Sequence, residues 1–125
     1  MSENEVGDII LGAAMKVHSA LGPGLLESAY EVCLAHEIGK HGLAVTRQQA
    51  LPISYDGIQL DTGYRLDLLV NDCVIVELKA IEKFAPIHTA QVLSYLKLSD
   101  LKLGYLLNFN VVHMRDGIKR IANGL

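Results

Sequence analysis

Residues 65–79, RLDLLVNDCVIVELK, decide the fold of this chain. Apolar residues dominate both halves of the stretch and Asn71-Asp72 between them is typical of a turn, so we predict two antiparallel strands. Opposed residues of such strands project to the same face. A two-residue turn would set Asp67 against Val76 and mix charge into both faces. Burial favours a three-residue loop, 71–73, because a one-residue slip turns every side chain over. This register gives one wholly apolar face through the pairs Val70 with Val74, Leu68 with Val76, and Leu66 with Leu78.

The predicted register sets Asp67 opposite Glu77, with Cβ atoms roughly 5 Å apart. Two carboxylates at that spacing repel each other unless one is protonated or a cation lies between them. Oxygen ligands suit Mg²⁺ or Mn²⁺, and Lys79 on the same face could orient a metal-activated water or stabilise charge on a phosphate. An exposed cluster of ion pairs would show the same spacing. The apolar run 73–76 before Glu77 favours an interior strand instead, where charges are costly.

Outward from this hairpin, the chain shows the signals of three helices and further strands. Helices are predicted over 2–21, with Ser2 and Glu5 as a capping box, over 25–40, and over 87–99 after Pro86. The order α-α-β-β-β-α-β-β-β predicts an α/β (α+β) fold, a central mixed sheet flanked by helices, in one domain over residues 1–125. The predicted strands span 43–55, 59–70, 73–80, 103–109, 111–114 and 118–121, with hairpin turns at 56–57 and 116–117.

The charge of the chain limits its partners. Its net charge is −3 and its isoelectric point is near 5.9, whereas proteins that bind phosphates usually carry a basic excess. Either the basic residues cluster locally, or nucleic acid is bound weakly, or the partner is of another kind. No apolar run approaches the ~20 residues that span a membrane, and the acidic start is unlike a targeting segment. With Cys33 and Cys73 interpreted as free thiols, a cytoplasmic location is expected.

Asp67, followed ten residues later by Glu77-Leu78-Lys79, resembles the signature of the PD-(D/E)XK nuclease superfamily, whose fold is of the restriction-endonuclease type. The proline that opens that signature is absent before Asp67, where Gly63-Tyr-Arg-Leu66 stands. Two further motifs occur in the expected order, and the similarity runs from about residue 9 to residue 121. Gln91 and Tyr95 resemble the Gln-x-x-x-Tyr motif of the RecB-like branch, while Gly24, Glu27 and Tyr30 match the pattern that names the GxxExxY protein family.

The resemblance implies a role for each matching residue. Asp67, Glu77 and the backbone carbonyl of Leu78 would hold Mg²⁺ or Mn²⁺, and Lys79 would assist the nucleophilic water. Glu27 would complete or orient the metal ligands, and Gln91 and Tyr95 would contact the nucleic acid backbone or position Lys79.

Plainer interpretations stay open for several of these side chains. Glu27 also suits the first turn of a helix, where an acid interacts with the helix dipole, and Tyr30 could simply pack its ring. Gln91 and Tyr95 could form the hydrated flank of an amphipathic helix. His88, on the same stripe, could contact phosphate or metal, or be solvated.

Two functions therefore remain. The first is a metal-dependent nuclease, or nuclease-like nucleic-acid-processing protein, that hydrolyses phosphodiester bonds of DNA or RNA. The second is a non-catalytic accessory module that keeps the nuclease fold and acts through protein–protein contacts, as a homodimer or with another partner. The acidic charge and small size motivate the second.

Overall fold

The structure is a computed structural model that describes residues 1–61 and 63–125. Its main sheet has the strand order β1-β4-β5-β6-β7, in which β5 and β6 run parallel and the other neighbours antiparallel. A separate two-stranded sheet joins β2 to β3. The elements in chain order are α1 (Glu3–Leu21), α2 (Glu27–Gly39), β1 (Val45–Ala50), β2 (Ile53–Tyr55), β3 (Ile58–Leu60), β4 (Arg65–Val70), β5 (Val74–Lys79), α3 (Pro86–Ser99), β6 (Leu103–Asn108), the 3₁₀-helix η1 (Met114–Gly117) and β7 (Ile118–Ala122).

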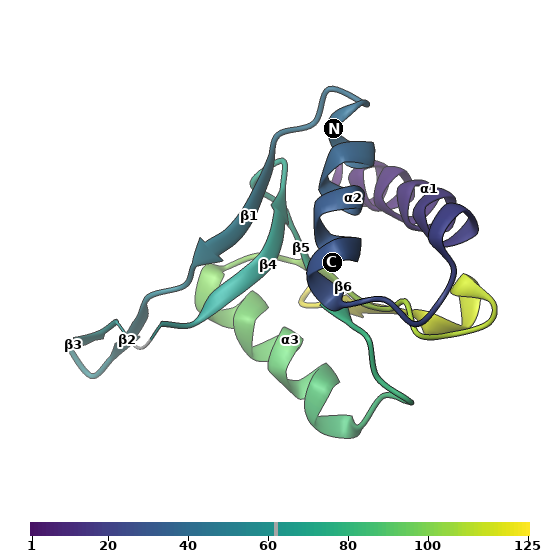
Figure 1. Cartoon of the computed structure of the whole chain (residues 1–125). Coiled ribbons are helices and arrows are strands. Elements are labelled where there is room, and N and C mark those ends of the chain that lie inside the picture. The colour runs from purple at the N-terminus through teal and green to yellow at the C-terminus, as the bar shows by residue number, and fades with distance from the viewer. Residues whose placement is uncertain (62) are drawn as a thin grey trace.

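This arrangement confirms the predicted α/β (α+β) class and the restriction-endonuclease-like mixed sheet with helices on it. Helices α1 and α2 cover one face of the sheet, and α3 covers the other (Figure 1). The strands β5 and β6 form the centre of the sheet, and both are buried almost throughout because helices lie on either side. The first core joins α1 and α2 to the sheet through Val6, Ile10, Tyr30, Leu34, Val76 and Leu107. The second joins α3 to it through Leu66, Ile75, Val92, Tyr95, Leu96 and Leu106.

The predicted helices are confirmed, with small changes at their ends. Ser2 caps α1: its hydroxyl accepts from the Glu5 amide at 3.2 Å, and the Glu5 carboxylate accepts from the Ser2 amide at 3.0 Å. Helix α2 begins at Glu27 rather than at residue 25. Pro86 occupies the first turn of α3, where its missing N–H is not needed.

The register around the central hairpin is confirmed over most of its length. Val70 pairs with Val74 and Leu68 with Val76, so the loop has the three predicted residues. The third predicted pair is wrong: Leu66 packs in the α3-side core, whereas Leu78 packs under α1 and α2. Leu66 and Leu68 of β4 therefore pack on opposite faces of the sheet, although they are two residues apart. The regular alternation of side chains in β4 is broken between them, at Asp67.

Several predicted strands are wrong in extent. The strand predicted over 43–55 is two strands, since Pro52 cannot donate a ladder hydrogen bond, and the strand predicted over 59–70 is interrupted before Arg65. Residues 111–114 form no strand, and the predicted hairpin at 116–117 is instead η1. Met114 is buried in the first core, which draws this connection inward.

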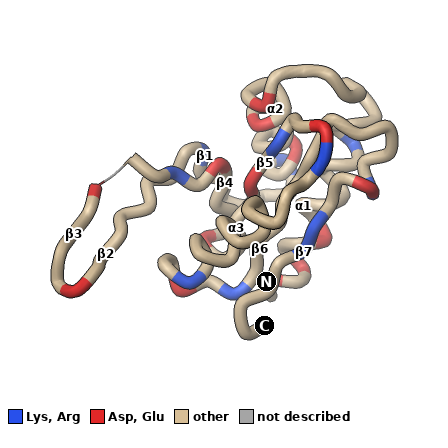
Figure 2. Tube along the Cα trace, turned by 90° about the horizontal axis from the view of Figure 1, so that it is seen from below, with Lys and Arg blue, Asp and Glu red and all other residues tan. Residues whose placement is uncertain are grey.

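The hairpin of β2 and β3 projects from the body of the molecule (Figure 1). Asp56 and Gly57 form its turn with φ values of 48° and 77°, as their sequence predicts. Acidic residues but no basic ones mark this hairpin in Figure 2. Among the residues described, no helix has both the length and the apolar character that crossing a membrane requires.

Candidate functional site

The candidate site lies where the backbone ladder between β4 and β5 ends. Beyond the Leu68–Val76 pair, side-chain carboxylates accept the hydrogen bonds that join the two strands. The Asp67 amide donates to Glu77 Oε1 at 3.0 Å, and the Leu78 amide donates to Asp67 Oδ2 at 2.9 Å. The two carboxylates are thus neighbours on adjacent strands, as the register argument predicted.

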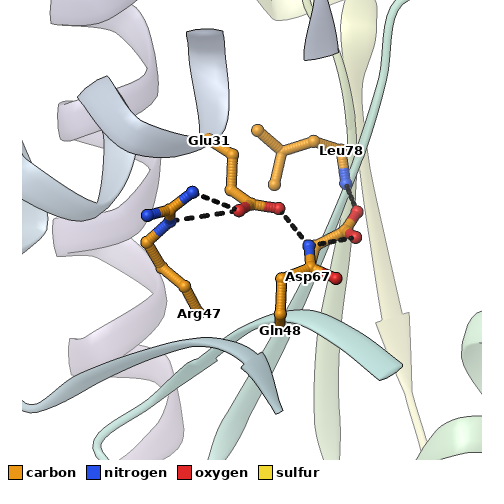
Figure 3. Close-up of polar contacts among 5 residues, drawn as sticks. All are labelled: Glu31, Arg47, Gln48, Asp67 and Leu78. Atoms are coloured by element: carbon orange, nitrogen blue, oxygen red, sulfur yellow. Dashed lines mark hydrogen bonds and ion pairs between the residues drawn. The ribbon is translucent and has the colours of Figure 1, made fainter. Parts of the chain in front are cut away.

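A third strand contributes to the same place through an unusual backbone conformation. Gln48 lies in β1 between the residues that pair with Leu66 and Leu68, and its φ is 52°. A positive φ is uncommon for a residue with a side chain and is found mostly where surrounding contacts enforce it. The Gln48 amide donates from Nε2 to Glu31 Oε1 at 2.6 Å and makes a longer contact of 3.4 Å with Asp67 Oδ1 (Figure 3).

Glu31 supplies a carboxylate from helix α2 that the sequence reasoning missed. It is only 6% exposed, and both Nε and Nη2 of Arg47 lie 3.1 Å from its Oε2 (Figure 3). Glu27, the acid predicted to reach the metal, is exposed in the first turn of α2. A sequence signal for Glu31 did exist, because it shares the helical spacing of the buried residues Leu34 and Ile38.

Burial dominates the electrostatics of Glu77. Its side chain is 5% exposed, so the alternative of an exposed ion-pair cluster does not hold for this residue. Desolvation, followed by the negative charge of Asp67, raises the pKa of Glu77 from its ordinary 4.5 to about 8. The Asp67 amide and the positive charge of Lys79 oppose that rise.

The end of β5 is fixed by Asn108, which the sequence reasoning had interpreted as a turn or edge residue. Asn108 instead pairs with Lys79 inside the sheet and is 2% exposed. Its Oδ1 accepts from the amides of Ile81 and Asn110, both at 3.1 Å, and its Nδ2 donates to the Ile81 carbonyl at 2.9 Å. The Phe109 amide also donates to the Lys79 carbonyl at 3.0 Å. These bonds hold the chain that follows Lys79 and so determine where Lys79 leaves the sheet.

Of the three predicted site residues on helix α3, Tyr95 lies within reach of the charges of Glu77 and Asp67, and Gln91 contacts Tyr95. Tyr95 is 8% exposed; burial raises its pKa, and the negative charge of Glu77 adds to the effect, while a contact with Gln91 opposes it. His88 lies one turn before Gln91, and its Nδ1 accepts from the Ala85 amide at 2.9 Å. The observed role of His88 is therefore to cap the start of α3.

Gly24 and Tyr30 hold the loop before α2. The Tyr30 hydroxyl donates to the Gly22 carbonyl at 2.6 Å and accepts from the Leu25 amide at 3.1 Å, and its ring stacks on Phe109 with centroids 4.6 Å apart. Gly24 has a φ of 97°, which a side chain would strain. The packing interpretation of Tyr30 is therefore the one that its contacts support.

The donor atoms at this site suit a hard divalent cation. Mg²⁺ is typically held by one or two carboxylates, with water and substrate phosphate completing its coordination. Asp67 and Glu77 provide two such carboxylates, and their mutual repulsion in a buried place is what a cation would relieve. Within residues 1–61 and 63–125, no three His, Cys, Asp or Glu side chains are grouped to hold a metal ion. The residues thus fit a cation that also needs water or substrate, and they do not form a closed protein cage.

Comparison with known proteins agrees with this geometry. The profile of the PD-(D/E)XK nuclease superfamily matches residues 4–121, which include β4, β5 and the three helices apart from the start of α1. Among curated proteins and among solved structures, the comparisons found no significant match. Because the family profile covers almost the whole chain, this protein belongs to the PD-(D/E)XK nuclease superfamily.

Proposed function

We propose that this protein is a metal-dependent nuclease that hydrolyses phosphodiester bonds of nucleic acid. One observation carries the proposal: two carboxylates, Asp67 and Glu77, lie together at the end of a buried ladder, each held by the backbone beside the other. Superfamily membership supports nuclease-like chemistry in general. We further propose that the chain belongs to the GxxExxY family, because Gly24, Glu27 and Tyr30 match its pattern. Gln91 and Tyr95 likewise support the RecB-like branch.

The positions of the residues support the following proposed roles. Asp67, Glu77 and the Leu78 carbonyl would hold Mg²⁺ or Mn²⁺, and Glu31 replaces Glu27 as the helical acid that orients Asp67 through Gln48. When bound, the cation would lower the pKa of water and neutralise charge on the phosphate. Lys79, at the end of β5, would stabilise the phosphate charge that develops during attack.

The proposal is tested by measuring cleavage of labelled DNA and RNA with Mg²⁺ or Mn²⁺. Lys79→Ala is expected to abolish cleavage while leaving the circular dichroism spectrum and melting temperature intact. Lys83→Ala, which removes an exposed lysine four residues away, is the matched control and should cleave normally. Equal rates in the Lys79→Ala variant and the unmodified protein would remove Lys79 from the mechanism.

A second candidate function is a non-catalytic module that keeps the fold and works through protein contacts. The contacts of the site favour this candidate, because they form without a cation. Backbone amides already donate hydrogen bonds to the carboxylates of Asp67 and Glu77, and Arg47 forms an ion pair with Glu31. This alternative predicts no saturable Mn²⁺ binding by calorimetry. A micromolar isotherm that Asp67→Asn abolishes would count against it and for the nuclease.

A further inference from the structure

A pocket shares Gln91 and Tyr95 with the candidate site and is otherwise lined by residues to which no role has been assigned so far. It has a volume of about 290 Å³, and its lining residues come from the base of the β2–β3 hairpin and from helix α3. Tyr95 forms part of its wall and packs in the same core as Leu66, which precedes Asp67 in β4. The charges of Glu77 and Asp67 also act on the Tyr95 hydroxyl, so the pocket lies near the candidate metal ligands. Its lining carries no charged side chain and consists of Ile53, Tyr64, Ile87, Gln91, Ser94, Tyr95 and Leu98.

Tyr64 gives this pocket an aromatic rim that is held in place and still accessible. Its backbone carbonyl accepts from the Leu51 amide at 2.9 Å, which fixes the residue at the base of the hairpin. Its ring meets Tyr95 edge-on, with centroids 6.4 Å apart and planes inclined by 60°. Because Tyr64 is 46% exposed, part of its ring remains available to a ligand, whereas Tyr95 is almost covered.

We propose that this pocket receives an unpaired base of the nucleic acid substrate, so that the protein acts on single-stranded or frayed ends rather than on intact duplex. The inference rests on the proposed nuclease function and names its substrate class. Proteins that bind single strands without sequence preference place aromatic rings beside the site that holds the phosphate backbone, because every base has a face that can stack. Gln91 and Ser94 offer hydrogen-bonding groups within the same wall.

The charge distribution disfavours a duplex held mainly through its phosphates. A protein that binds duplex mainly through phosphates needs many lysines and arginines along its surface, and this chain has 11 against 14 acidic residues. The segment 48–64, which borders the pocket, contains Asp56 and Asp61 and no lysine or arginine (Figure 2). A single strand also needs phosphate contacts, but stacking of its unpaired bases adds affinity that a duplex with paired bases does not gain.

The test is binding of a fluorescent 15-nucleotide single strand, and of the duplex of the same sequence, in Ca²⁺ at low salt. The single strand should bind more tightly, and Tyr64→Ala should weaken its binding about 5- to 150-fold, the range for losing one stacked base. Tyr64→Phe should keep the affinity. A strand carrying 2-aminopurine should lose fluorescence on binding, and Tyr64→Ala should prevent that loss.

Tyr55→Ala is the matched control, because Tyr55 is the same residue type, is 70% exposed and lies at the hairpin tip outside the pocket. Equal affinity for duplex and single strand, or unchanged binding by Tyr64→Ala, would overturn the inference. Binding of neither form would also overturn it. The nuclease proposal fails separately, by absence of metal-dependent cleavage of any substrate; duplex cleavage that Tyr64→Ala leaves unchanged would keep it and reject the single-strand inference.

Discussion

Replacing Glu77 with glutamine should make the metal-free protein more stable at alkaline pH. Burial, with the neighbouring charge of Asp67, raises the pKa of Glu77 to about 8 in the folded protein, against 4.5 for the ordinary side chain. Between these two values the folded chain binds a proton that the unfolded chain has lost. The stabilisation is therefore complete below pH 4.5 and is lost progressively as the pH rises to about 8.

The size of the effect follows from the same two values. Each pH unit within the window corresponds to about 1.4 kcal/mol, so the whole window is worth at most about 5 kcal/mol. Between pH 5.5 and pH 8 the loss should reach about 3 kcal/mol, a large share of the 5–15 kcal/mol typical of a folded domain. In Glu77→Gln this loss should disappear, because the amide does not titrate while its oxygen can still accept from the Asp67 amide.

Urea unfolding in EDTA, at intervals from pH 5.5 to pH 8.5, measures the difference. Burial raises the pKa of the Cys73 thiol, but any contribution of this thiol is common to both proteins and cancels when their profiles are compared. Glu82→Gln, which removes the same charge from an exposed position, should follow the unmodified protein. Mn²⁺ should restore stability at pH 8.5 to the unmodified protein and not to Glu77→Gln. Parallel pH profiles for the unmodified protein and Glu77→Gln would refute the reasoning.

Three further substitutions, with Gly12→Ala as a control, test the packing around the site by urea unfolding. Asn108→Ala should cost about 2–4 kcal/mol, because the Ile81 amide and carbonyl would lose their buried partner. Gly117→Ala should cost about 3 kcal/mol or more, since the new Cβ would clash with the Asn108 carbonyl oxygen, whereas Gly12→Ala in an open part of α1 should stabilise by up to about 1 kcal/mol. Tyr30→Phe should cost about 1–2 kcal/mol through its two lost hydrogen bonds, and no change would indicate that the loop before α2 holds without them.

The sequence predicts the central hairpin well because local rules determine it. Binary pattern and loop length give the register of β4 against β5, and the Pro86 and Ser2 signals give the starts of two helices. The pattern fails at Leu66, and the reason is physical. Period-two alternation assumes an unbroken ladder, whereas the Asp67 amide donates to the Glu77 side chain instead of to a backbone carbonyl.

The segment after β6 shows a second kind of failure. Apolar residues at 111–114 and the Asp116-Gly117 pair are typical of a strand and a hairpin. In the structure, Val111 accepts a hydrogen bond at its carbonyl from His18 Nε2 at 2.7 Å, and Met114 packs in the first core. Contacts with α1, about ninety residues away in sequence, thus override the local preference, and no window of sequence contains them.

Glu31 shows what distinguishes a motif from a site. The sequence motif singles out Glu27, yet a carboxylate can act at Asp67 only if its helix turns it toward the sheet. Glu31 satisfies that condition because it lies on the buried face of α2, where its carboxylate accepts a hydrogen bond from the Gln48 side chain. The contact depends on a positive φ at Gln48, a backbone state that its residue type does not predict. If Glu31 orients Asp67 as proposed, Glu31→Gln should weaken Mn²⁺ binding measured by calorimetry, whereas Glu27→Gln should leave it unchanged; the reverse result would return the role to Glu27.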